Sequence, residues 1–175
     1  LLRQRDEMMP VHQCLDAGDI EGAIAMATGC VAGGSRYSSA FQKLLGELFL
    51  ETGRIDEAQA LYTKVLEVRP LDWARVGMAK VKSATGELET ANDWLSQIID
   101  SNPFCMQAYD ALVDSTRQQQ NMERAQEVLQ AAVDVSPMSI VRQTSLAETA
   151  SGNHDYKAAS KAYSRAVRLR EHSCH

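Results

Sequence analysis

The sequence predicts an all-α solenoid of stacked, antiparallel helix pairs, and three observations lead to this class. First, an alanine in a similar context recurs every 33 to 35 residues, at Ala23, Ala58, Ala91, Ala125 and Ala159. Second, the positions four and seven after each alanine are mostly apolar, which is the spacing of one helix face. Third, a 45% hydrophobic content with only four prolines favours helices over sheets. Units this short must stack on neighbours to bury an apolar face.

The first unit, residues 4–38, is the least regular of the five. Its second half is in register, but Pro10 falls inside its first half, and residues 31–39 form a glycine-containing connector that we expect to be flexible. The other units comprise residues 39–71, 72–105, 106–139 and 140–173. We therefore predict one solenoid domain over residues 1–175. Because the chain starts without methionine, at "LLRQRDEMMP", we expect it to be a piece of a longer protein that lacks an N-terminal domain.

Each later unit reads as helix A, a turn, helix B and a short connector. The expected A helices comprise residues 38–52, 72–85, 106–119 and 140–152. The first two end at Gly53 and Gly86, which suits a turn with positive φ. Helix B follows, and a proline ends it in three of the four units. An alanine early in helix B allows the two helices to cross closely, because a bulkier side chain would push them apart.

Composition and charge exclude several classes of function. The net charge of −5 is mild and spread along the chain, which argues against a dedicated nucleic-acid surface, where a basic stripe is expected. No apolar run spans a bilayer, and no secretory signal segment precedes the first unit. We expect a cytoplasmic protein with free thiols that binds neither nucleic acid nor membranes.

The search for catalytic and metal-binding motifs gives none. The only dense group of ligand types is "HSCH", with His172, Cys174 and His175 at the chain end, where the supporting contacts of a metal site are not expected. Acidic pairs such as Asp56 and Glu57 stand at helix starts, where they favour the helix dipole. We expect no enzyme activity, no cofactor and no metal.

Residues 39–71 resemble the tetratricopeptide repeat. The matching positions are Leu45, Gly46, Phe49, Ala58, Tyr62 and Pro70. Later units match more loosely, and the resemblance extends over about residues 4–173. It implies a right-handed superhelix of five helix pairs, in which the A helices line a concave groove that binds a protein or peptide.

The phrases "RPLDWARVGMAK", "NPFCMQAYDALVD" and "VSPMSIVRQTSLAE" look like the repeat region of bacterial response regulators that join a receiver domain to tetratricopeptide repeats. This resemblance implies the output or scaffold half of a two-component signalling protein, with a possible homo-oligomer. A second interpretation stays open, in which the repeats recruit substrates or partners for an enzyme domain elsewhere in the parent chain.

The resemblance also places the groove residues, through repeat positions that face the concave side. The candidates for partner binding are Lys43, Glu47, Trp73, Lys80, Gln107, Asp110, Asp114 and Arg117. Trp73 has two interpretations, because a tryptophan at a helix start either packs on the preceding connector or anchors a partner. Reversing the charge of Lys80, Asp110 or Arg117 is expected to weaken partner capture without affecting the fold.

Overall fold

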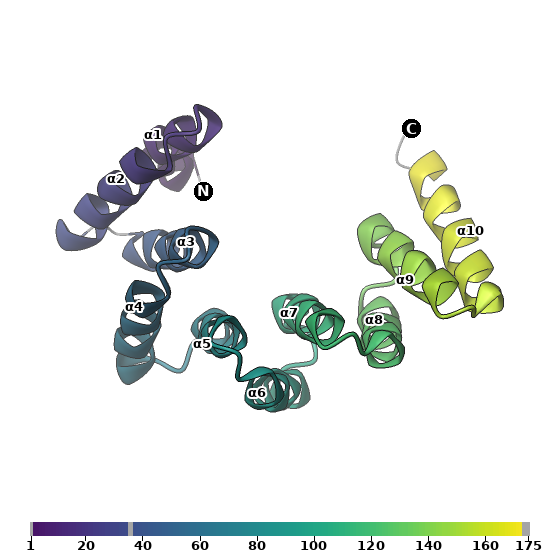
Figure 1. The fold of residues 1–175 in the computed structure, drawn as a ribbon. Coiled ribbons are helices and arrows are strands. Elements are labelled where there is room, and N and C mark those ends of the chain that lie inside the picture. Colours follow the sequence, from purple (N-terminus) through teal and green to yellow (C-terminus); the bar gives the residue numbers. More distant parts are fainter. Residues whose placement is uncertain (1, 35–36, 173–175) are drawn as a thin grey trace. The chain divides into compact units, whose positions relative to one another are not determined.

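The structure, a computed structural model, describes residues 2–34 and 37–172, and this part of the chain folds into ten α-helices (Figure 1). Their bounds are α1 Leu2–Asp16, α2 Ile20–Ala32, α3 Ser38–Glu51, α4 Ile55–Val68, α5 Asp72–Ala84, α6 Leu88–Ser101, α7 Met106–Gln118, α8 Met122–Val135, α9 Ile140–Gly152 and α10 Tyr156–His172. No strand occurs in the described ranges. The predicted all-α fold with ten helices is confirmed.

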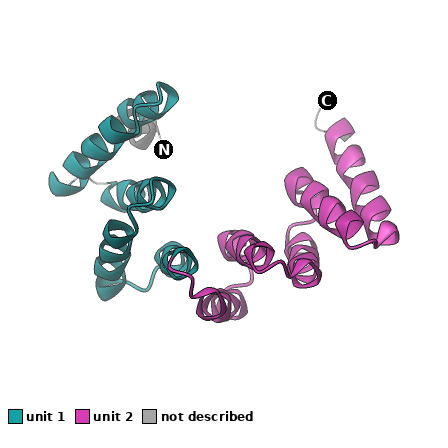
Figure 2. Cartoon of the chain, in the orientation of Figure 1, with its two compact units in different colours: residues 1–84 teal, residues 85–175 magenta. Residues whose placement is uncertain are grey.

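Two compact units divide the chain, residues 1–84 and 85–175 (Figure 2). In the first unit, each of α1 to α4 packs on the helix that follows it, and α3 also contacts α5. In the second unit, consecutive helices from α6 to α10 pack on each other, most extensively α9 on α10. Each unit is thus a stack of helices whose neighbours in sequence are neighbours in space.

The turn from helix A to helix B has one backbone conformation in all five repeats. Gly18, Gly53 and Gly86 adopt φ of 77°, 72° and 88° there. Gln120 and His154 hold the same place in the last two repeats with φ of 58° and 62°. These two residues adopt a left-handed conformation that L-residues rarely take, so the repeat geometry is kept where its usual glycine is lost.

The recurring alanines form the core, as predicted. Ala23, Ala58, Ala91 and Ala125 are fully buried, and Ala159 is 5% exposed. The position four residues later differs between repeats. Tyr62, Leu95 and Leu129 are buried, whereas the equivalent Tyr163 on α10 is 43% exposed. Among the described helices, only α9 packs extensively on α10, which leaves Tyr163 on a flank that no helix in the described part of the chain packs against extensively.

The first repeat is more helical than its sequence suggested. Helix α1 continues through Pro10. The connector expected at residues 31–39 is shorter than predicted, because α2 extends to Ala32 and α3 begins at Ser38. At the end of α2, the Gly33 amide donates to the Gly29 carbonyl, which keeps the helical hydrogen-bond pattern to the last turn. The expected flexibility of residues 35 and 36 concerns positions outside the described residues.

Candidate functional site

The eight predicted groove residues fall on three A helices in two units. Lys43 and Glu47 lie on α3 and Trp73 and Lys80 on α5, all in the first unit. In the second unit, α7 carries Gln107, Asp110, Asp114 and Arg117. We therefore describe one helix-A face in each unit.

The helix-A face of the first unit is partly used for packing. Trp73 is half-buried and its ring contacts that of Tyr62 edge to face, with 6.2 Å between centroids and 63° between planes. Of the two interpretations of Trp73, this geometry favours packing. Burial raises the pKa of the Tyr62 hydroxyl above its usual range, and the nearby negative charge of Glu47 adds to this shift. Lys43 and Glu47 are half-buried, whereas Lys80 is exposed.

The helix-A face of the second unit has polar cross-links between α7 and α9. The first joins Arg142 to Asp110, with 2.8 Å between Nη2 and Oδ2. The Arg142 side chain is 19% exposed and that of Asp110 is 55% exposed. An ion pair shielded to this degree is less screened by salt than a fully exposed one. It therefore holds the Asp110 carboxylate in a defined position on α7.

A second cross-link lies nearer the C-terminal end of α7. Nη2 of Arg117 donates to Oγ of Ser145 at 3.1 Å and to Oγ1 of Thr149 at 2.8 Å. Thr149 is buried and also donates to the Ser145 carbonyl at 2.9 Å. Arg117 is half-buried, so its charge reversal would leave these hydroxyls without a donor. Charge reversal is therefore expected to leave the fold unaffected at exposed Lys80 but to disturb packing at Arg117.

Exposed side chains surround these cross-links. Gln107 and Asp114 are exposed on α7, and Val141 and Glu148 are exposed on α9, Val141 by 78%. The face thus combines carboxylates, an amide and an aliphatic side chain beside two anchored arginines. Such a mixture suits a peptide or protein surface with both apolar and polar groups.

Sequence reasoning missed Arg142, Ser145 and Thr149. Each lies on α9 and bonds to a residue of α7 that is 28 to 32 residues earlier in the chain. The signal that could have found them is this separation, which is slightly less than one repeat. It identifies polar pairs on adjacent A helices.

Other predicted features have plain outcomes. Cys14, Cys30 and Cys105 are free thiols. Within the ranges that the structure describes, no group of three His, Cys, Asp or Glu side chains is arranged to hold a metal ion. The "HSCH" residues Cys174 and His175 lie outside the described residues, as does the side chain of His172. Among the described helices, none combines the length and apolarity that crossing a bilayer requires.

Comparisons with known proteins agree with this architecture. Residues 44–70 match the family model described as tetratricopeptide repeat. TTC0263, a thermophilic tetratricopeptide repeat protein of Thermus thermophilus, has a similar structure, with a TM-score of 0.73 and 14% identity over 94% of this chain and 90% of that one. MamA of Desulfovibrio magneticus RS-1 is also similar, with a TM-score of 0.63 and 20% identity over 95% and 94% of the two chains.

One curated relative is similar in sequence. The human protein O-mannosyl-transferase TMTC1 is 26% identical over 94 residues, which is 53% of this chain. The match spans only 11% of the length of the human protein. Together, the family model and the structural similarities support a tetratricopeptide repeat fold.

Proposed function

We propose that this chain is a non-enzymatic protein-interaction module that binds a protein or peptide through its helix-A faces. The observation that carries the proposal is the pair of cross-links between α7 and α9, Arg142 with Asp110 and Arg117 with Ser145 and Thr149. They hold polar side chains in place next to exposed Asp114 and Glu148. Side chains that are ordered before binding lose less conformational entropy when a partner arrives, which favours recognition at this face.

The experiment is a binding titration of the whole chain with charge-reversed variants. Asp114→Lys and Glu148→Lys change exposed carboxylates that form no ion pair among the described residues. We expect the double variant to lose most of its affinity for captured partners and to melt like the parent. The matched control, Glu67→Lys with Asp93→Lys, alters two exposed carboxylates outside the A helices by the same charge. Equal binding by both double variants would refute the proposed face.

We further propose that the module is the cytoplasmic output or scaffold region of a bacterial two-component response regulator. The support is the resemblance of its phrases around residues 69–80, 102–114 and 135–148 to such regions. In this mechanism, phosphorylation of an upstream receiver changes how the receiver docks, and this docking exposes or covers the helix-A faces of the repeats. The required coupling free energy between the two events is typically about 1–3 kcal/mol.

A titration of the full parent protein tests this regulation, with and without a phosphate mimic on the receiver. Different affinities for the same captured partner support the mechanism, and equal affinities refute it. A second candidate is a recruiting arm of a larger enzyme, which the 94-residue similarity to a human transferase favours. The residues that precede Leu1 in the parent gene separate the candidates, because a receiver carries a phosphoacceptor aspartate and an enzyme domain carries a catalytic motif.

A further inference from the structure

Helix α10 concentrates positive charge in a chain whose net charge is −5. It carries five of the eighteen lysines and arginines, and Glu171 is its only acidic residue. Lys157, Lys161, Arg165 and Arg168 follow one another at steps of four, four and three residues, so they form a row along one side of the helix. All four side chains are exposed, and none forms an ion pair within the described part of the chain.

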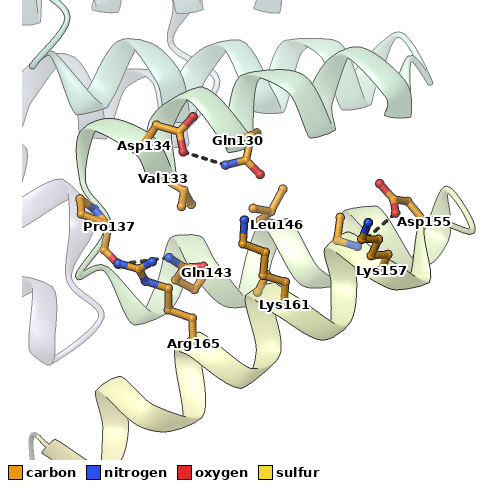
Figure 3. Close-up of a pocket in the computed structure, with 12 residues that line it drawn as sticks. Gln130, Val133, Asp134, Pro137, Gln143, Leu146, Asp155, Lys157, Lys161 and Arg165 are labelled. Atoms are coloured by element: carbon orange, nitrogen blue, oxygen red, sulfur yellow. Dashed lines mark hydrogen bonds between the residues drawn. The ribbon is translucent and has the colours of Figure 1, made fainter.

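The row borders two adjoining hollows beside α10. The first has a volume of about 390 Å³ and lies between α8, α9 and α10, with Val133 and Leu146 among its apolar lining. Figure 3 shows Lys161 and Arg165 extending from α10 into this space. The second hollow also includes Lys161 and Arg165. It continues toward Arg168 and Met138, and Met138 is 70% exposed.

Two acidic residues line the first hollow, Asp155 at the start of α10 and Asp134 near the C-terminal end of α8. Asp134 and Asp155 line the first hollow together with Lys157, Lys161 and Arg165. Asp134 accepts from the Gln130 amide at 2.8 Å. Asp155 accepts from the Gln126 amide at 3.0 Å and from the Ala158 backbone N–H at 3.1 Å, at the start of α10.

Further acidic side chains line the open surface by the N-terminal ends of α8 and α10, including those of Glu123 and Glu127. No carboxylate lines the second hollow. Acidic side chains therefore gather near the helix starts, whereas the lining of the second hollow, which includes Arg168, is cationic and apolar apart from Ser164.

We propose that Lys161, Arg165 and Arg168, with Met138, form a docking site for a short acidic segment of a partner protein that also carries an apolar side chain. No carboxylate lines the second hollow, which includes all three cations, so their positive charge complements glutamates or aspartates of a partner. Met138 offers a flexible, polarizable contact for an aliphatic or aromatic group. This cationic docking site lies on α10 and the α8–α9 connector, outside the helix-A faces, so it is a second binding surface.

Charge and shape together favour a peptide over other anionic partners. A nucleic acid or a lipid surface would also be attracted to three cations, but the acidic side chains toward the helix starts would repel an extended polyanion. The apolar lining of the hollows gives a peptide side chain a place that a phosphate backbone cannot use. The proposal therefore commits to a peptide whose acidic residues lie at the Arg168 end.

The test is a fluorescence-anisotropy titration of the whole chain at low salt with a short, end-capped peptide of glutamates and leucines. Its analogue with glutamines in place of the glutamates is the neutral probe. The triple variant Lys161→Gln, Arg165→Gln, Arg168→Gln removes the site. The matched control Lys64→Gln, Arg69→Gln, Arg170→Gln removes the same charge from exposed positions elsewhere, one of them on another side of α10.

We expect the glutamate peptide to bind the parent and the control, and to bind the triple variant at least about ten-fold more weakly. Thermal melts establish that each variant is folded, and the single variant Arg168→Gln should give a smaller loss in the same direction. Equal weakening in the control would overturn the proposal, because it would reflect overall charge. Equal binding of the glutamine peptide, or binding only to anionic vesicles or double-stranded DNA, would also overturn it.

Discussion

The ring of Tyr62 on α4 lies directly against the backbone of Gly77 on α5. A Cβ added to Gly77 would lie 2.2 Å from Cζ of Tyr62, closer than real Cβ atoms approach other heavy atoms. Gly46 on α3 borders the same ring, and its added Cβ would lie 2.4 Å from the hydroxyl oxygen. Tyr62 is 2% exposed. Two glycines on two A helices thus create the space for one large side chain of the intervening helix B.

Gly77→Ala should therefore destabilise the first unit. The new methyl group overlaps a buried ring that cannot move without disturbing α3, and we expect a loss of about 1–3 kcal/mol in the free energy of unfolding. Gly29→Ala is the matched control, because Gly29 lies inside α2 with no atom near its added Cβ. Helix propensity predicts a gain there of up to about 1 kcal/mol. Urea denaturation measures both, and a stabilised Gly77→Ala variant would contradict the packing.

The raised pKa of Tyr62 predicts a loss of stability in alkali. The unfolded chain releases the phenolic proton near pH ~10, whereas the folded state retains it, so the stabilisation is present below that pH and decreases above it. Above that pH, the contribution of Tyr62 to the free energy of unfolding falls with a slope that approaches about 1.4 kcal/mol per pH unit. Urea denaturation between about pH 8 and 11 measures it.

Tyr62→Phe keeps the ring and should remove that part of the slope. Burial also raises the pKa of Tyr109, with a smaller effect of Asp100, so Tyr109→Phe should flatten the remainder. Tyr156, which is 66% exposed, provides the control Tyr156→Phe. An unchanged slope in Tyr62→Phe would show that this hydroxyl is not the origin.

Replacing Gln120 with glycine should stabilise the second unit. Gln120 adopts φ of 58° in the turn where the first three repeats have glycine. Glycine adopts this conformation without steric cost, and this effect outweighs the greater conformational entropy of glycine in the unfolded chain. We therefore expect the free energy of unfolding to increase by about 0.5–1 kcal/mol. Gln97→Gly, at an exposed position inside α6, should lose about 1 kcal/mol. The melting temperatures of the two variants should shift in opposite directions. A lower melting temperature in both variants would argue against strain at Gln120.

The Arg117 cross-link should contribute to the packing of α7 on α9. Arg117→Met keeps most of the aliphatic stem but removes the hydrogen bonds to Ser145 and Thr149, so we expect a loss of about 1–3 kcal/mol. A double-mutant cycle with Thr149→Val measures the coupling between the two side chains. Arg170→Met, exposed on α10, should change the free energy of unfolding by less than about 0.5 kcal/mol. Additive losses in the cycle would show that the hydrogen bond contributes nothing.

The repeat period, the helices and the buried alanines were predictable from sequence alone. Ala58, Ala91 and Ala125 recur at one spacing, and the 3.6-residue helix period places each of them on the face that its repeat must bury. Helix formation and the buried face of each helix depend on residues that are close in sequence, so the sequence pattern predicts them. The left-handed conformation of Gln120 and His154 was harder to predict, because these turns lack the glycine that marks the same position in the first three repeats.

Only the tertiary structure determined which side chains of different helices meet. Tyr62 lies between Gly46 and Gly77, and Asp110 pairs with Arg142, through contacts that depend on how neighbouring helices are rotated and shifted against each other. A repeat pattern gives the spacing of helices but not this rotation, because many side chains on facing helices share similar periodicity. The cationic row on α10 was present in the sequence, but its position beside the hollows of α8 and α9 follows from packing alone.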